Sequence, residues 1–210
     1  MGSYTRGGFY AERIFPWIMD RTDTPELRQE RWRTVSEARG RVLEIGIGTG
    51  ANFSHYGRAT RWVVAIEPSA GMNRRARRNL KNAWVPVRLV AAEAERLPFP
   101  DGAFDAVIAV LVLCTVPDPG KALAEARRVL APGGRLLFFE HVRAREPRLE
   151  RWQHRLQPVW GRLAGGCHLA RDMERQIADA GFAIEAIDRF RLPHVPRIVG
   201  RMIRGRATGS

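Results

Sequence analysis

The chain holds 210 residues, and its 35 Lys and Arg against 22 Asp and Glu give a formal net charge of +13. This length suits one compact domain, and a 45% share of hydrophobic residues is enough for a core, which argues against wholesale disorder. The longest uncharged apolar stretch, 106–116, has 11 residues, whereas a membrane-spanning helix needs about 20. The N-terminal region lacks an apolar run of the secretory type, so we expect a cytoplasmic protein.

Two segments of the chain are strongly basic. Segment 71–88 has six basic residues and no acid, and segment 189–210 has six arginines and no acid. Such segments attract anions, acidic lipids and polynucleotides, but no nucleic-acid-binding motif accompanies them. We therefore expect no specific nucleic-acid partner, and the two segments are candidates for peripheral contact with an anionic membrane.

Short apolar runs alternate with helical patterns along the first two thirds of the chain. Thr24 before Pro25 predicts a helix start, and Gly40 is expected to follow the helix end at residue 39. The predicted strands are 41–45, 62–67, 85–91, 104–111 and 135–142, with helices beginning near residue 51, over 70–82, and from 118 to the break at 132–134. This alternation predicts a parallel α/β sheet with right-handed crossovers and helices on both faces.

The pattern changes after residue 142. A helix is expected over 147–163 with an interruption at Pro158, and a second one over 171–180. The segments 182–190 and 195–202 are expected to form a terminal pair of strands.

A glycine-rich turn stands where the first predicted strand meets the next helix. It reads Glu44-Ile-Gly46-Ile-Gly48-Thr-Gly50, and glycines there let the backbone turn sharply and approach a ligand closely. Gly46, Gly48 and Ala51 also satisfy the dinucleotide pattern, so the loop alone does not choose between NAD and another nucleoside cofactor. A tight turn without any ligand is a further alternative.

Two acids follow the second and third predicted strands. Glu67 comes 21 residues after Gly46, where a carboxylate can accept both hydroxyls of a ribose. Glu93, together with the backbone N–H of Ala94, can read the polar edge of an adenine. The alternatives are an ordinary charge at a strand end for Glu67 and an exposed helix start for Glu93.

Three ordered motifs, at 41–50, 94–105 and 127–136, resemble the class I S-adenosylmethionine-dependent methyltransferases of the type 11 group, which includes quinone C-methyltransferases. Within that group, 111–115, 140–142, Trp160 and 166–169 are most similar to the methyltransferase-like alkyl thiol methyltransferases and their bacterial relatives. The resemblance runs from Phe9 to the C-terminus. It implies a Rossmann-like α/β fold, with a mostly parallel seven-stranded sheet, an antiparallel C-terminal strand and helices on both faces.

The resemblance also implies one domain in three parts. An N-terminal helical lid would span 1–40, a cofactor-binding core 41–142, and acceptor-side helices with the C-terminal strand pair 143–210. The cofactor would be S-adenosyl-L-methionine and the product S-adenosyl-L-homocysteine. The acceptor would be a small, fairly apolar molecule, a thiol first and a quinone carbon or another lipid-type nucleophile second.

The resemblance assigns the cofactor contacts to particular residues. These are Glu44, Gly46, Gly48, Gly50, Asn52, Glu67, Pro68, Met72, Glu93, Ala94 and Leu111. Glu44 would lie near the ammonium of the cofactor and Glu67 at its ribose. Pro68 and Met72 would flank the adenine, and Leu111 would lie beside the methionine portion.

His141, at the end of the fifth strand, is the candidate catalytic residue, as a base or as a group that orients the acceptor. The alternative is a histidine whose ring is satisfied by backbone groups. The adjacent Cys167 and His168 lack partners for a metal site, so we expect packing there and no metal. Cys114, in an apolar run, is expected to be a small buried residue.

Four aromatic residues are weaker candidates, because ordinary packing explains each of them better than a place in the site. Phe9 and Tyr10 are expected in a lid over the cofactor, and Trp152 and Trp160 in an apolar acceptor pocket. Two further function classes stay open from the residues alone. One is an adaptor that binds a nucleoside cofactor and acts on RNA or anionic surfaces without catalysis, and the other is an NAD enzyme.

Overall fold

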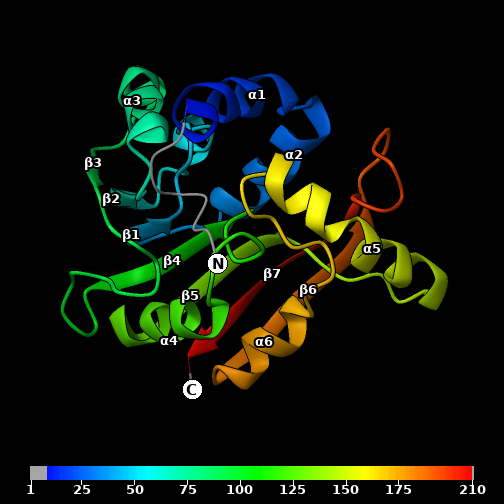
Figure 1. Cartoon of the computed structure of the whole chain (residues 1–210). Helices are drawn as coiled ribbons and strands as arrows, with labels where there is room; N and C mark the ends of the chain where they lie inside the picture. Colours follow the sequence, from blue (N-terminus) through cyan, green and yellow to red (C-terminus); the bar gives the residue numbers. More distant parts are fainter. Residues whose placement is uncertain (1–8, 210) are drawn as a thin grey trace.

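The computed structural model describes residues 9–209, in which helices cover both faces of one sheet (Figure 1). The helices are the π-helical turn η1 (Tyr10–Ile14), α1 (Phe15–Thr22), α2 (Pro25–Val35), the 3-10 turns η2 (Phe53–His55) and η3 (Leu80–Asn82), α3 (Ala70–Asn79), α4 (Pro119–Val129), α5 (Pro147–Leu163) and α6 (Met173–Asp179). The strands are β1 (Gly40–Ile45), β2 (Thr60–Ile66), β3 (Val87–Val90), β4 (Phe104–Val110), β5 (Leu130–His141), β6 (Phe182–Arg191) and β7 (Arg201–Gly209). Within this part of the chain, every helix is too short or too polar to cross a bilayer.

The strands lie in the order β3-β2-β1-β4-β5-β7-β6. β1 pairs in parallel with β2 and β4, and the parallel set continues to β3 and β5. β7 pairs antiparallel with both β5 and β6, so the predicted antiparallel C-terminal strand is confirmed. The strand order reverses between β1 and β4, and open α/β sheets bind ligands at the carboxyl ends of strands at such a reversal.

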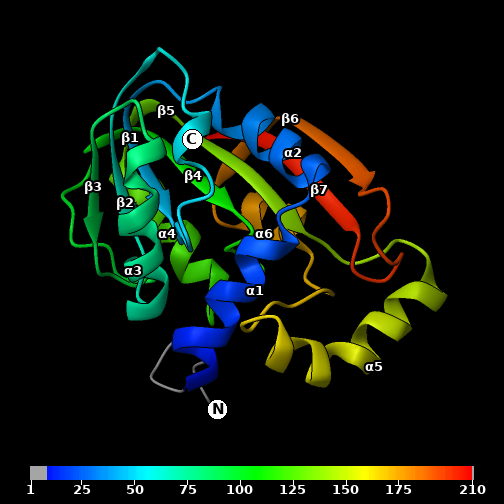
Figure 2. The same cartoon turned by 90° about the horizontal axis from the view of Figure 1, so that it is seen from above.

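Two apolar layers hold the helices to the sheet. Consecutive residues of a strand point to opposite faces, so Phe138 packs with the α4 and α6 side, including Leu123 and Ile177. Phe139 packs with the opposite side, where Val35 at the end of α2 is fully buried. Figures 1 and 2 show α4 and α6 on one face of the sheet and α1 to α3 on the other. The predicted helices on both faces are therefore confirmed.

Three helix predictions differ from the structure. α2 ends at Val35, four residues early, because the backbone N–H of Ala38 turns back to the Val35 carbonyl. The helix expected near residue 51 is only the short turn η2, since buried Asn52 and Tyr56 hold this segment to the interior. α5 is continuous, with the exposed Pro158 inside it.

The second strand of the predicted terminal pair is misplaced. The structure has it at 201–209 and not at 195–202, because the Pro196 carbonyl accepts backbone hydrogen bonds from Val199 and Gly200 and closes a turn there. The strand itself holds Gly205, where an added Cβ would lie 2.3 Å from the Ala186 carbonyl oxygen. A glycine-containing, arginine-rich strand has weak intrinsic preference for a sheet, and its pairing on both sides outweighs that preference.

Candidate functional site

A cavity of about 680 Å³ lies at the carboxyl ends of β1, β2 and β4. The loops after these strands form one part of its wall, and η1 and α1 form another. Eight predicted site residues lie on the wall: Gly46, Gly48, Glu67, Pro68, Met72, Glu93, Ala94 and Leu111. Glu44, Gly50, Asn52 and His141 lie elsewhere among the described residues.

The glycine turn after β1 gives the cavity an open stretch of backbone. Gly46 and Gly48 have positive φ values of 66° and 56°. A Cβ on Gly46 would lie 2.2 Å from Val112, whereas a Cβ on Gly48 would meet nothing within 4 Å. Gly50 turns inward, where a Cβ would lie 2.4 Å from the ring of Phe53. A ligand can therefore approach the backbone closely at Gly48.

Glu67 presents a buried carboxylate to the cavity directly after β2. Its side chain accepts backbone hydrogen bonds from Gly48 at 3.0 Å and Ser69 at 2.9 Å, and the residue is only 8% exposed. Burial raises the pKa of Glu67, and the two backbone hydrogen bonds oppose that rise. A carboxylate accepts about four hydrogen bonds, so two acceptor positions remain for a ligand with paired hydroxyls.

Pro68, Met72 and Ala94 form an apolar side of the cavity between the ends of β2 and β3. The side chain of Ser69 caps α3 by accepting the backbone N–H of Met72 at 3.3 Å, which fixes Met72 in the first helical turn. Glu93 stands exposed at the edge of this side. Apolar surface with a few polar groups at its border is typical of a small-molecule site.

Leu111 has strained backbone at the end of β4. Its φ is 57°, in the left-handed region that a branched side chain seldom adopts, and its N–H is held by the Phe139 carbonyl at 2.8 Å. Strain of this kind concentrates at ligand sites, because the surrounding structure has to enforce it. This observation strengthens the assignment of the β4 end to the site.

Glu140 enforces the turn that follows Leu111, and the sequence analysis did not place it in the site. Its fully buried carboxylate accepts backbone hydrogen bonds from Val112, Leu113 and Cys114 at 2.9–3.1 Å. Burial raises the pKa of Glu140 well above its usual range, and these three bonds oppose the rise. The sequence did offer a signal for this role: Glu140 directly follows the apolar run 136–139, and a buried carboxylate requires hydrogen-bond donors.

Glu44 and Asn52 lie behind the cavity wall, in a network that differs from the expected contact with an ammonium. Each carboxylate oxygen of Glu44 accepts one hydrogen bond, from the Asn52 amide and from the Tyr56 hydroxyl, and the residue is buried away from the cavity wall. Asn52 accepts a hydrogen bond from Arg31 at 3.2 Å, and Arg31 lines the cavity. Burial raises the pKa of Glu44 to about 7, against the lowering effect of its two hydrogen bonds. Glu44 therefore acts on the cavity through Asn52 and Arg31.

The N-terminal helices cover one side of the cavity. Tyr10, Phe15 and Met19 lie on its wall, and the Tyr10 hydroxyl donates to the Leu163 carbonyl at the end of α5 at 2.6 Å. Phe9 is 76% exposed and does not contribute to the wall. The two tryptophans expected in an acceptor pocket also lie off the wall, Trp152 on the surface and Trp160 in a small apolar cluster.

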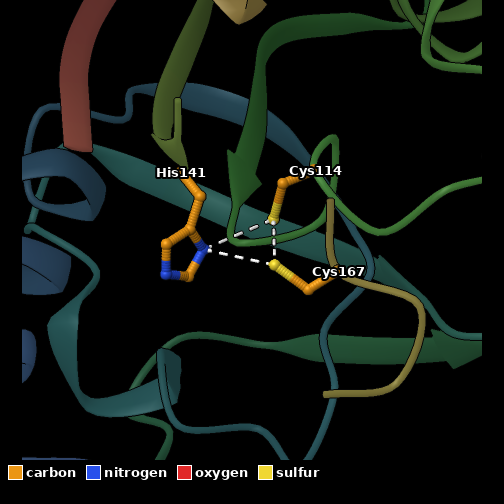
Figure 3. Close-up of side chains that lie close together, drawn as sticks. All are labelled: Cys114, His141 and Cys167. Atoms are coloured by element: carbon orange, nitrogen blue, oxygen red, sulfur yellow. Dashed lines mark hydrogen bonds between the residues drawn. The ribbon is translucent and has the colours of Figure 1, made fainter. Parts of the chain in front are cut away.

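His141 lies in a cluster with the two cysteines of the chain (Figure 3). Its Nδ1 is 3.6 Å from Sγ of Cys114 and 3.6 Å from Sγ of Cys167, and both cysteines are buried and free. Nδ1 of His141 contacts the two cysteine sulfurs. The alternative, in which backbone groups satisfy the ring, therefore does not hold at this atom. The sequence did not predict this cluster, because His141 is 27 residues from Cys114 and 26 from Cys167.

Comparison with known proteins identifies the family. Residues 43–138 match the family model described as a methyltransferase domain. Thiol S-methyltransferase TMT1B from Homo sapiens is 36% identical over 183 residues, which cover 81% of this chain and 74% of that protein. The chain belongs to the class I S-adenosylmethionine-dependent methyltransferases. The predicted enzyme class and cofactor are confirmed, and the NAD alternative is set aside.

One more relative and one solved structure are similar to the chain. Demethylmenaquinone methyltransferase from Renibacterium salmoninarum is 40% identical over 116 residues, covering 52% of this chain and 47% of that protein. The structure of the N-methyltransferase NodS from Bradyrhizobium japonicum, in complex with S-adenosyl-L-homocysteine, is similar with a TM-score of 0.67 at 20% identity, covering 93% of this chain and 92% of that chain. This second likeness concerns the fold.

Proposed function

We propose that this methyltransferase transfers the methyl group of S-adenosylmethionine to the sulfur of a small, fairly apolar thiol. The observation that carries the proposal is the 36% identity to a thiol S-methyltransferase over most of both chains. The cavity supports it, because the wall away from the glycine turn includes the apolar side chains of Phe15, Met19 and Val116.

The cofactor is proposed to occupy the part of the cavity between the glycine turn and Glu67. The open backbone at Gly48 admits its amino-acid portion, and the free acceptor positions of Glu67 take the ribose hydroxyls. Pro68 and Met72 flank the adenine, with Glu93 and Ala94 at its edge. These residues fit the cofactor because they combine exposed backbone, a buried carboxylate and an apolar slot. When bound, S-adenosylmethionine supplies a methyl group on a positively charged sulfur.

The chain has mainly to position the acceptor, because displacement at the methyl carbon requires the nucleophile and the leaving sulfur in line. A thiol with a pKa near 8.5 is a few per cent thiolate at neutral pH, so it needs less help from a base than an amine or a hydroxyl. Leu111, beside the proposed methionine portion, and the helices η1 and α1 hold the acceptor and exclude water. His141 is proposed to handle the acceptor together with the two cysteines beside it.

A quinone carbon is the second candidate acceptor. It is favoured by the 40% identity to demethylmenaquinone methyltransferase, which covers 47% of that protein. We rank it second because the thiol S-methyltransferase matches a larger share of both chains.

The chain is proposed to divide by role into a lid (1–40), a cofactor core (41–142) and an acceptor side (143–210). Residues 1–8 of the lid lie outside the described residues. The wall residues Tyr10, Phe15 and Met19 support the lid, and the bond from Tyr10 to α5 joins lid and acceptor side. A cytoplasmic location stays a prediction.

A screen with isotopically labelled S-adenosylmethionine tests the acceptor. Alkyl thiols, quinols, phenols and amines are each incubated with the enzyme, and product masses are measured. We expect labelled thioethers from apolar thiols, and Glu67→Gln as the matched control should lower their yield. Labelled product from quinols alone would favour the second candidate and contradict the first.

A further inference from the structure

Cys114, His141 and Cys167 place three metal-binding atoms at the corners of a nearly equilateral triangle (Figure 3). The two Sγ atoms are 3.6 Å apart, and each lies 3.6 Å from Nδ1 of His141. A disulfide holds its sulfurs about 2.05 Å apart, so the two cysteines are not bonded to each other. The triangle comes from three segments: the turn after β4, the end of β5 and the loop after α5.

This spacing matches the coordination geometry of zinc. A tetrahedral Zn²⁺ with Zn–S bonds of about 2.3 Å and Zn–N bonds of about 2.0–2.1 Å separates its ligand atoms by roughly 3.5–3.8 Å. We propose that Cys114, His141 and Cys167 bind one Zn²⁺ ion, as two thiolates and one neutral imidazole. Soft sulfur ligands combined with imidazole select zinc over magnesium or calcium, which prefer oxygen.

The backbone around each ligand is held in place. Cys114 donates its N–H to Glu140 at 3.1 Å and accepts the backbone N–H of His168 at 2.7 Å. The carbonyl of Cys167 accepts from the side chain of Gln157 in α5 at 2.9 Å. Outer partners of this kind orient metal ligands, so little rearrangement is needed to receive the ion.

The surroundings of the cluster suit an electrically neutral site. Two thiolates cancel the charge of Zn²⁺, and Arg171, which donates to the Leu113 carbonyl at 2.6 Å, interacts electrostatically with the buried Glu140. The buried Nε1 of Trp160, which packs against this cluster, finds no hydrogen-bond acceptor among the described residues. An N–H at this place can donate to the thiolate of Cys167, as outer donors do at thiolate sites.

Three protein ligands leave a fourth coordination position, which is the pattern of catalytic and not of closed structural zinc sites. Thr115 adjoins both the cluster and the cavity: it lines the cavity, and its Oγ1 lies 3.7 Å from Sγ of Cys114. The fourth position would hold the sulfur of the proposed thiol acceptor, on which this role rests, and the ion would stabilise that sulfur as a thiolate once its proton has passed to solvent. The sulfur then bonds to the methyl carbon as the bond from carbon to the cofactor sulfur breaks, giving a thioether and S-adenosyl-L-homocysteine.

Metal content tests the site without reference to activity. The reduced protein is incubated with Zn²⁺, dialysed and measured by elemental mass spectrometry, and Co²⁺ is substituted to record thiolate-to-metal absorption bands. We expect roughly one tightly held ion per chain and cobalt–thiolate bands. Cys114→Ser, Cys167→Ser and His141→Gln should each weaken binding by more than the roughly 10–100-fold that loss of an outer partner costs.

His168→Ala is the matched control, because this exposed histidine adjoins Cys167 but lies outside the triangle, and it should keep the ion. Thermal melting and S-adenosylmethionine binding identify any variant that fails to fold. A wild-type protein that binds the cofactor but holds no Zn²⁺, or an ion retained in the triple variant, would overturn the site. Thiol titration that finds Cys114 and Cys167 oxidised together would replace it with a redox pair.

The role of the fourth position has its own readout. An apolar thiol added to the Co²⁺ form should add a further thiolate-to-metal band. Methylation of that thiol without any new band would remove the metal from the acceptor step while the site and the proposed function both stand. A new band without methylation would instead contradict the proposed function.

A second surface carries an independent inference. α5 exposes Trp152, Leu156, Val159 and Leu163 by 40–58%, at spacings that place them on one helical face. Arginines flank this face at positions 148, 151, 155 and 162, all of them exposed. The guanidinium of Arg155 lies 5.5 Å from the ring centre of Trp152. In Figures 1 and 2, α5 stands at the rim of the molecule, clear of the sheet.

We infer that this face of α5 lies in the interface of an anionic membrane. Apolar side chains including Trp, bordered by arginines, are typical of helices that lie in the headgroup region, where positive charge selects anionic lipids. The only acid of α5, Glu150, is paired with Arg143. The Tyr10 hydroxyl bonds the carbonyl of Leu163, so the helix at the membrane also contacts the cavity lid.

Sedimentation with lipid vesicles tests the α5 surface. Vesicles of phosphatidylglycerol with phosphatidylcholine should bind the protein, and pure phosphatidylcholine vesicles should bind far less of it. Leu156→Glu with Val159→Glu should abolish binding, whereas Arg77→Glu with Arg78→Glu in the basic segment 71–88 should retain most of it. The reverse pattern, or equal binding to both vesicle types, would contradict the proposal.

Discussion

At the scale of single residues, the site depends on carboxylates that are buried yet differ in their partners. Glu67 and Glu44 each accept two hydrogen bonds, but Glu67 faces the cavity, whereas Glu44 lies behind its wall with Asn52 and Tyr56 as partners. Glu140 uses its carboxylate to hold the turn after β4. Burial raises the pKa of all three carboxyl groups, so the direction of the shift does not distinguish them. Their hydrogen-bond partners and their places relative to the cavity do.

Glu67→Gln is expected to weaken S-adenosylmethionine binding by about 1.5–3 kcal/mol, roughly 10- to 150-fold, because it removes charge-assisted hydrogen bonds to the ribose. Titration calorimetry measures the change directly. Glu93→Gln should weaken binding less, since this side chain at the proposed adenine edge is exposed. An unchanged dissociation constant for Glu67→Gln would take Glu67 out of the site.

Glu44 predicts a pH dependence of stability. Its pKa is about 7 in the folded protein against roughly 4.3 when unfolded, so the folded state binds the proton more tightly. The stabilisation is therefore fully present below about pH 4 and is lost as the pH rises through 7. Glu44→Gln should flatten the fall in unfolding free energy between pH 5 and 8, measured by urea titration. A fall as steep as that of the wild type would assign the effect to other groups, such as Glu67.

At the scale of helices and strands, local signals placed most starts correctly, and contacts with distant segments set the ends. Thr24 caps α2 by accepting the Leu27 N–H, as the sequence predicts. The end of that helix depends on the hydrogen bond from the Ala38 N–H to the Val35 carbonyl, and no residue type near the turn predicts it. Pro158 shows the opposite case. A local signal to break α5 is overridden there, and Gln153 and Gln157, in the turns before the proline, tie the helix to neighbouring loops.

Tyr10→Phe tests the contact between the N-terminal lid and α5. The variant loses one hydrogen bond, from the Tyr10 hydroxyl to the Leu163 carbonyl, while its ring can still pack near Phe15. We expect faster release of S-adenosylmethionine in stopped-flow measurements, by a few-fold, since one such bond is worth about 1 kcal/mol. Its melting temperature should change little. An unchanged release rate would show that the lid closes without this bond.

At the scale of the whole molecule, charge and topology both depend on segments far apart in the chain. The arginines of β7 and its surroundings form ion pairs: Arg201 with Glu146, Arg204 with Glu30 and Arg206 with Glu37. The basic segment 189–210 is thus largely neutralised, and it is a poorer membrane contact than its composition indicates. In our second inference, the exposed arginines of α5 make the membrane contact instead.

Removal of residues 201–210 tests the topology. β7 lies between β5 and β6, so the truncated chain loses the backbone partners of both strands. We expect no cooperative thermal transition in circular dichroism. Arg197→Ala, in the exposed loop before β7, serves as the control and should melt like the wild type. A cooperative transition in the truncated protein would show that β7 is dispensable.

The sequence by itself determined the class of fold, the order of most elements, the glycine turn and the position of Glu67, because each of these depends on residues close together in the chain. Only the tertiary structure decided that Glu44 lies behind the wall, that the last strand is 201–209, and that Cys114, His141 and Cys167 meet. The physical reason is that these features arise from packing between segments tens of residues apart. The local spacing of residues does not predict which distant side chains become neighbours.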